Sequence, residues 1–91
     1  MHNLYSNESL IKLYLSPYCS TEVTDNGLDI YQYLFDKNIV IILTNEDAEK
    51  LLYRLETGML MTELIDFLAQ YYQIDEAEEY VYFMMQNGVL E

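Results

Sequence analysis

The hydrophobic pattern of this chain changes its period once, at Thr44. Before Thr44, aliphatic side chains alternate with polar or aromatic ones, and this period of two is typical of half-buried β-strands. After Thr44, apolar side chains recur every three or four residues, as they do along one face of an α-helix. Strands followed by helices predict an α+β fold, because the strands and helices of a parallel α/β sheet alternate along the chain.

The part before Thr44 predicts a three-stranded antiparallel sheet. Strand signals cover residues 10–24, which Ser16-Pro17 breaks into 10–15 and 18–24, then residues 28–35 as the second strand and 39–43 as the third. Asp25-Asn26-Gly27 predicts a tight hairpin turn, because Asn-Gly readily takes positive φ angles, and Asp36-Lys37-Asn38 predicts a second turn. Two rows alternate within residues 28–35, an aliphatic row of Leu28, Ile30 and Leu34 and an aromatic row of Tyr31, Tyr33 and Phe35.

Three helices are predicted after this sheet. Thr44 and Asn45 can cap the first helix, and Thr57-Gly58 ends it, since glycine readily adopts the left-handed cap conformation. The second helix covers about residues 60–72, and the third opens at residues 75–78 and ends at Asn87-Gly88. The expected apolar faces are Ala48, Leu51, Leu52 and Leu55; then Leu60, Leu64, Phe67 and Leu68; then Ala77, Val81, Met84 and Met85. This order of elements predicts a winged helix-turn-helix whose wing precedes its helices.

A chain of 91 residues has material for only one hydrophobic core. We expect a single domain over residues 10–91 after a flexible start over residues 1–9. The longest apolar run, residues 39–43, is too short to span a membrane, and the polar start lacks the features of a signal peptide. Cys19 is the only cysteine and cannot form an internal disulfide, so a cytoplasmic location is expected.

Catalytic and cofactor-binding patterns are missing from the sequence. A nucleophilic Cys19 would need a base, and the single histidine is His2. The three glycines lie too far apart for a phosphate-binding loop, and the sequence contains no calcium-binding loop. We therefore expect no enzymatic activity, no cofactor and no metal site.

The net charge of -12 makes the surface strongly negative. Four basic residues are too few to neutralise the phosphates that nucleic-acid binding requires, and an anionic membrane is an equally poor partner. Six acidic residues are expected in first turns of helices, where the helix dipole stabilises carboxylates: Glu46, Asp47, Glu49, Glu76, Glu78 and Glu79. The alternative is an acidic surface that attracts a basic peptide or a basic protein, with Glu76 and Glu79 steering the encounter.

Ten tyrosines exceed what one small core can bury. Tyrosine combines a large rigid surface with a polar tip, which makes it frequent in interfaces. Besides the aromatic row of the middle strand, Tyr80, Phe83 and Met84 run down the third helix. We expect a partner to cover part of this aromatic surface.

Several local patterns occur together in the second half of the chain. They are the apolar strand of residues 39–43, Thr44-Asn45, Ala48 with Leu51-Leu52, Leu55-Glu56-Thr57-Gly58, Met61-Thr62-Glu63-Leu64 with Leu68, and Gly88-Val89-Leu90. With them, the sequence resembles the PqqD-like RiPP recognition element. This small winged-helix domain binds the leader peptides of ribosomally synthesised, post-translationally modified peptides. Length and element order also agree, so the resemblance covers roughly residues 10–90.

The resemblance implies a non-catalytic protein that binds a precursor leader peptide and delivers it to a separate modifying enzyme. That enzyme would be a radical SAM enzyme, a cyclodehydratase, a dehydratase or a protease. In the family, the leader adds as an antiparallel strand beside the third strand and lies against the third helix. A short, uncharged, β-branched edge strand suits this mode, because a bare edge readily pairs with another chain. The expected peptide-binding residues are Asn38, Ile39, Val40, Ile41, Ile42, Leu43, Tyr80, Phe83, Met84 and Asn87.

Two other classes of function remain open at this point. One is an acidic interaction or inhibitor module, antitoxin-like, whose surface mimics an anion. The other is a DNA-binding winged helix, which the fold permits and the charge disfavours. Neighbouring genes would separate these classes: a precursor-peptide gene beside a modifying-enzyme gene supports leader binding, and a toxin gene supports inhibition.

Overall fold

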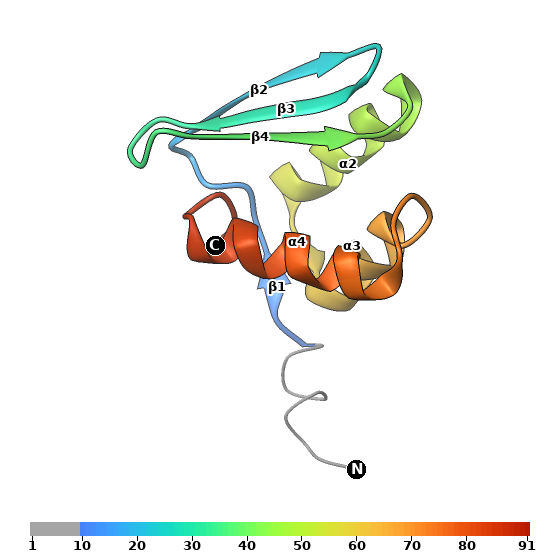
Figure 1. The fold of residues 1–91 in the computed structure, drawn as a ribbon. Coiled ribbons are helices and arrows are strands. Elements are labelled where there is room, and N and C mark those ends of the chain that lie inside the picture. Colours follow the sequence, from blue (N-terminus) through green and yellow to red (C-terminus); the bar gives the residue numbers. More distant parts are fainter. Residues whose placement is uncertain (1–9) are drawn as a thin grey trace.

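The computed structural model describes residues 10–91, and its main sheet consists of three antiparallel strands in the order β2-β3-β4. These strands are β2 (Cys19–Thr24), β3 (Gly27–Gln32) and β4 (Lys37–Ile42). Three helices follow them in the sequence and lie on one side of the sheet (Figure 1). The predicted α+β fold, a three-stranded antiparallel sheet followed by three helices, is confirmed. The flexible start expected over residues 1–9 lies outside the described residues.

The first predicted strand does not belong to the main sheet. Within residues 10–15, only β1 (Lys12–Leu13) is a strand, and it pairs with β5 (Met59–Leu60) in a small second sheet. Leu15 forms an isolated antiparallel bridge with Leu90 near the end of the chain. Alternation in the sequence identified an extended segment correctly but could not identify its partner strand. A strand buries every second side chain whichever sheet it joins.

Both turns of the main sheet end earlier than predicted. The β2–β3 turn consists of Asp25 and Asn26, and the positive φ of 147° belongs to Gly27, which is the first residue of β3. β3 ends at Gln32 and not at residue 35, so the second turn covers residues 33–36 and includes Asp36 at φ 53°.

Because β3 ends early, the predicted aliphatic row is wrong at one position. Leu34 is exposed, and the buried side chain that follows Leu28 and Ile30 is that of Gln32. Both ends of the Gln32 amide are hydrogen-bonded: its Nε2 donates to the Gly88 carbonyl (2.9 Å), and its Oε1 accepts from the amides of residues 34 and 35. A buried polar side chain needs such partners, and here they tie the β3–β4 turn to the end of the chain.

The helices are α2 (Asn45–Thr57), α3 (Met61–Leu68) and α4 (Ile74–Gln86). The predicted cap of α2 is present, since Thr44 Oγ1 accepts from the Asp47 amide (3.2 Å). Gly58 ends this helix with a positive φ of 100°, as expected. α3 is shorter than predicted, because residues 69–72 form a turn that reverses the chain before α4.

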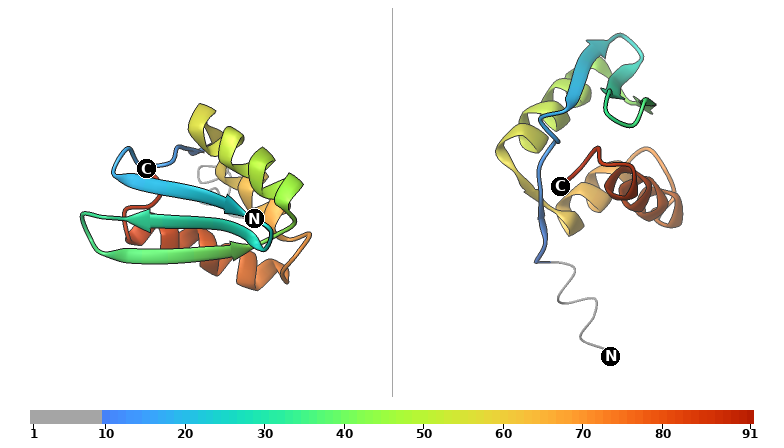
Figure 2. Two further views of the ribbon diagram at one scale, coloured as in Figure 1. Left: turned by 90° about the horizontal axis from the view of Figure 1, so that it is seen from above. Right: turned by 90° about the vertical axis from the view of Figure 1, so that its left-hand side faces the viewer.

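One hydrophobic core joins the sheet to the helices. α2 packs against β2 and β3, and α3 packs against α4, so the helices form a layer beneath the sheet (Figure 2). The buried core residues are Leu13, Leu28, Ile30, Ile39, Ile41, Leu43, Ala48, Leu51, Leu55, Met59, Met61, Leu64, Leu68, Ala77, Val81, Met84, Val89 and Leu90. Leu52, Phe67 and Met85, which were expected on inner faces, are partly buried around this core. Within residues 10–91, no helix has the length and apolar character needed to cross a membrane.

Candidate functional site

β4 is an edge strand, and alternate residues direct their backbone groups away from β3. The Leu43 amide donates to the Asn26 carbonyl (3.2 Å), so these two residues form a hydrogen-bonded pair just beyond the end of the β3–β4 pairing. Hydrogen-bonded and non-hydrogen-bonded pairs alternate along antiparallel strands. The N–H and C=O groups of Asn38, Val40 and Ile42 therefore point to the open edge.

The phenol of Tyr72 closes this edge at Ile42. Its hydroxyl accepts from the Ile42 amide (3.0 Å) and lies 3.4 Å from the Ile42 carbonyl, to which it can donate. The neighbouring Tyr71 hydroxyl contacts Thr44 and donates to the carboxylate of Asp47, which holds the α3–α4 turn against the start of α2. What remains open is the part of β4 that precedes Ile42.

The open part of the edge is shorter than the predicted binding strand. Ile39, Ile41 and Leu43 have buried side chains, and their backbone groups face β3. These three residues therefore offer a peptide neither a side chain nor an unpaired backbone group. Asn38 and Val40 remain, and the Val40 side chain is 47% exposed on the outer face of the sheet.

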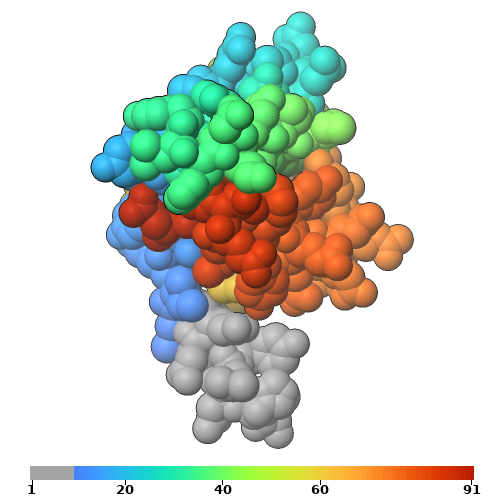
Figure 3. All heavy atoms as spheres, turned by 60° about the vertical axis from the view of Figure 1, so that its left-hand side comes forward, coloured from blue at the N-terminus to red at the C-terminus, as the bar shows by residue number. Residues whose placement is uncertain are grey.

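α4 runs along the open edge of β4 in the opposite direction and is tied to it at both ends. Just before α4, Tyr72 reaches Ile42 at the end of β4. Just after α4, Gly88 accepts the hydrogen bond of Gln32 and lies under the ring of Phe35, which precedes β4. Figure 3 shows the side chains of β4 (green) lying directly along those of α4 (red) on this face of the molecule.

A hollow of about 420 Å³ lies on α4 and is lined by Glu76, Glu79, Tyr80 and Phe83. Their spacing of three, four and seven residues from Glu76 puts all four side chains on one face of the helix. The Tyr80 ring packs on Tyr72, with 4.7 Å between ring centroids, and Tyr72 in turn reaches the β4 edge. Burial raises the pKa of Tyr80, with further contributions from Tyr72 and Glu76. The phenol is a hydrogen-bond donor at neutral pH, as tyrosine ordinarily is.

The two other α4 residues predicted for the site lie outside this hollow. Met84 is fully buried beside Ala77 and Val81 on the core side of α4, so it offers a peptide no surface. Asn87 follows the helix, and its side-chain amide donates to the Phe83 carbonyl (2.8 Å). Asn87 therefore caps the end of α4.

The prediction that six acidic residues occupy first turns is correct for three of them, Glu46, Asp47 and Glu76. It is wrong for Glu49, Glu78 and Glu79, because α2 begins at Asn45 and α4 begins at Ile74. The effect of the helix dipole falls off within the first turn. The dipole therefore does not account for the carboxylate of Glu79.

Local partners also distinguish Glu79 from other acidic residues. The Glu76 carboxylate accepts from the Gln73 amide (3.2 Å), which stabilises the start of α4. In the first two helices, Lys50 pairs with Glu46 and Asp47, and Arg54 pairs with Glu63 (2.9 Å). In the part of the chain that the structure describes, no basic side chain pairs with Glu79. Glu79 is thus an exposed, uncompensated charge on the wall of the hollow.

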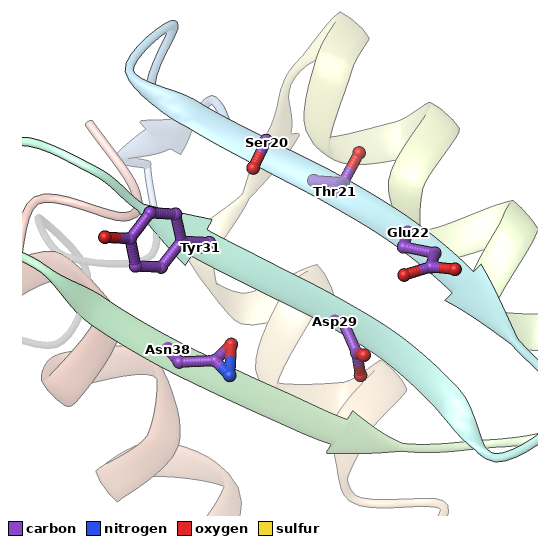
Figure 4. Close-up of a pocket in the computed structure, with 6 residues that line it drawn as sticks. All are labelled: Ser20, Thr21, Glu22, Asp29, Tyr31 and Asn38. Carbon is purple, nitrogen blue, oxygen red and sulfur yellow. The ribbon is translucent and has the colours of Figure 1, made fainter.

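A second hollow of about 270 Å³ lies on the outer face of the main sheet (Figure 4). Its lining is polar: Ser20, Thr21, Glu22, Asp29, Tyr31 and Asn38. Glu22 and Asp29 are direct cross-strand partners, so two carboxylates face the same solvent region. The Tyr31 hydroxyl donates to Asp36 (2.7 Å), and this bond raises the pKa of Tyr31. The described residues include no group of three or more His, Cys, Asp or Glu side chains arranged to hold a metal ion.

Cys19 begins β2, and its Sγ lies 3.9 Å from the Val89 carbonyl. Burial raises the pKa of this thiol, and the charge of Glu91 raises it further. A raised pKa means a smaller thiolate fraction at pH 8, and the thiolate is the form that reacts. We expect iodoacetamide to alkylate Cys19 more slowly in the folded chain than in urea, as measured by mass spectrometry. Equal rates in the two conditions would contradict this assignment.

The open edge of β4 at Asn38 and Val40, together with the hollow on α4, is called the β4–α4 face below. It combines unpaired backbone groups, aromatic surface and an uncompensated carboxylate. No protein-family model matches the chain, and neither the curated proteins nor the solved structures include a match.

Proposed function

We propose that this chain binds the leader segment of a ribosomally made precursor peptide and presents it to a separate modifying enzyme in the cytoplasm. The leader adds to β4 as an antiparallel strand and rests on α4. The chain itself has no catalytic role in this proposal. The radical SAM enzyme, cyclodehydratase, dehydratase or protease that completes the pathway would act on the presented peptide.

The observation that carries the proposal is the pair of unpaired backbone positions beside the α4 hollow. Asn38 and Val40 each offer one N–H and one C=O to an added strand, so an incoming peptide can form four main-chain hydrogen bonds. Phe83 is 46% exposed on the neighbouring helix, where it can cover an apolar side chain of that peptide. Main-chain bonds supply affinity in this mode, and the helix face selects side chains.

Amide hydrogen exchange tests this proposal residue by residue. The ¹⁵N-labelled chain is mixed with a synthetic leader of a short precursor encoded beside its own gene, and exchange is followed by NMR. We expect the added protection to concentrate at the amides of Asn38 and Val40, with little change at Ile39 and Ile41, which are already bonded to β3. Protection that is absent from both open positions at saturating peptide would refute strand addition.

Tyr72→Phe supplies a matched variant for the same measurement. Removing the hydroxyl frees the backbone groups of Ile42, so the open edge becomes one bonding position longer. Bound peptide should then also protect the Ile42 amide, while the free chain loses about 1 kcal/mol of unfolding free energy. If the peptide adds no more protection at the Ile42 amide in the variant than in the original chain, Tyr72 does not limit the added strand.

A further inference from the structure

We propose that the β4–α4 face selects peptides in which a basic residue precedes an apolar residue by two positions, in the order basic-x-apolar. This inference rests on the proposed strand addition and specifies the class of peptide that the site takes. The basic side chain would lie beside Glu79, and the apolar side chain would lie beside Phe83.

The pleat of the sheet decides which peptide residues meet α4. Side chains directly opposite each other on paired strands lie on the same face of the sheet. Val40 is exposed on the outer face, whereas Ile39 and Ile41 face the core and the helices. The peptide residues opposite Ile39 and Ile41 therefore point toward α4, and they are two positions apart.

The spacing of the α4 side chains matches this interval. Glu79 and Phe83 are four residues apart, which is about 6 Å along a helix that rises 1.5 Å per residue. Two residues of a strand span about 6.6 Å. One side chain of the peptide can thus meet Glu79 while the next one on the same face meets Phe83.

The direction of α4 fixes the order of the two residues. The start of α4 lies beside Ile42, and its end lies beside the turn before β4, so Glu79 is nearer the Ile41 end of the edge than Phe83 is. A peptide antiparallel to β4 passes Ile41 before it passes Ile39. Its residue beside Glu79 therefore precedes its residue beside Phe83.

Glu79 lacks a partner of opposite charge among the described residues. Its carboxylate is exposed, has no basic partner within residues 10–91 and lies beyond the first turn of α4. A Lys or Arg of the peptide would pair with it at the rim of an apolar contact. Such an exposed ion pair contributes little to the binding free energy, but the Glu79 carboxylate would repel a peptide with an acidic residue at the same position.

The test is a selection followed by a charge swap. The purified chain is used to select from a display library of random eight-residue peptides, and enriched peptides are titrated by fluorescence anisotropy. We expect Lys or Arg two positions before an apolar residue, and the reversed order should bind several-fold more weakly. Glu79→Lys should weaken a basic-x-apolar peptide about fivefold, and replacing the peptide's basic residue by Glu should restore binding to that variant.

Glu78→Lys is the matched control, since it makes the same charge change one residue away. At 3.6 residues per turn, Glu78 points about 160° away from Glu76 and Tyr80 around the helix, so it should change affinity less than twofold. Equal losses in the two variants, or selected peptides that protect Asn38 and Val40 without the basic-x-apolar order, would overturn this inference and leave strand addition standing. A selection that yields no peptide protecting Asn38 or Val40 would overturn strand addition, and the sequence preference with it.

Discussion

Replacing Val40 by proline is expected to weaken peptide binding about tenfold or more while the domain stays folded. Proline lacks the amide hydrogen, and the Val40 amide points to the open edge, so the substitution removes a donor that only an added strand would use. The bound peptide would be left with an unpaired carbonyl, and the proline ring would stand where its backbone approaches. Proline is tolerated on edge strands for this same geometric reason, and we expect a stability loss of about 1 kcal/mol.

Val40→Thr is the companion variant, because it keeps the amide and the β-branched shape. Its affinity should stay within twofold of the original chain, and thermal unfolding of both variants checks that the fold survives. Ile41→Pro would be a poor substitute, since that residue bonds β3 and its loss would disrupt the sheet. A folded Val40→Pro variant with undiminished affinity would mean that the peptide does not pair with β4.

The elements that the sequence predicted well are those whose signals are local. The Thr44 cap and the glycine end of α2 depend on neighbours within four residues, and the structure contains both. Most residues of the predicted apolar faces are buried, but Leu60 lies in β5 before α3, and Leu52, Phe67 and Met85 are only partly buried. The β1–β5 pairing joins residues 12–13 to residues 59–60. Local alternation contains no information about so distant a partner, which is why the first strand was placed in the wrong sheet.

The same distinction applies to the candidate site. The sequence assigned Glu76 and Glu79 to electrostatic steering and Tyr80 and Phe83 to peptide binding, and the structure places all four around one hollow. Met84 was predicted as a binding residue because it follows Phe83 in the sequence. A helix turns about 100° per residue, so the Met84 side chain points into the core. Tyr72 could not have been found, because its role depends on a turn that returns the chain to Ile42, thirty residues earlier.

Tyr72 also explains how a hydrophobic edge strand can persist in a free chain. Edge strands invite unwanted pairing unless something blocks them. Here the phenol occupies both edge-facing groups of Ile42, and the Gln32 side chain ties the turn before β4 to Gly88. The unprotected stretch is reduced to two bonding positions, which is short for indiscriminate aggregation and long enough for a peptide that also gains contacts on α4.

The largest loss of stability is expected from Gly27→Ala. A Cβ on Gly27 would lie 2.0 Å from the Ile41 carbonyl oxygen and 2.9 Å from the Leu43 amide nitrogen, and both are backbone atoms of the β3–β4 pairing. The φ of 147° adds strain for any residue with a side chain. We expect a loss of about 3 kcal/mol or more in the free energy of unfolding, measured by urea denaturation, because β3 and β4 must separate to make room.

Gly58→Ala calibrates this prediction. Gly58 also has a positive φ, but a Cβ there would meet the ends of the Tyr14 and Lys12 side chains, which can move away. Its cost should be limited to backbone strain, about 1–2 kcal/mol. The order of the two losses tests the packing of β4 directly: if Gly58→Ala is as destabilising as Gly27→Ala, the backbone of β4 is not held as close to Gly27 as the structure describes. A β4 that could yield so easily would also be a poor template for an added strand.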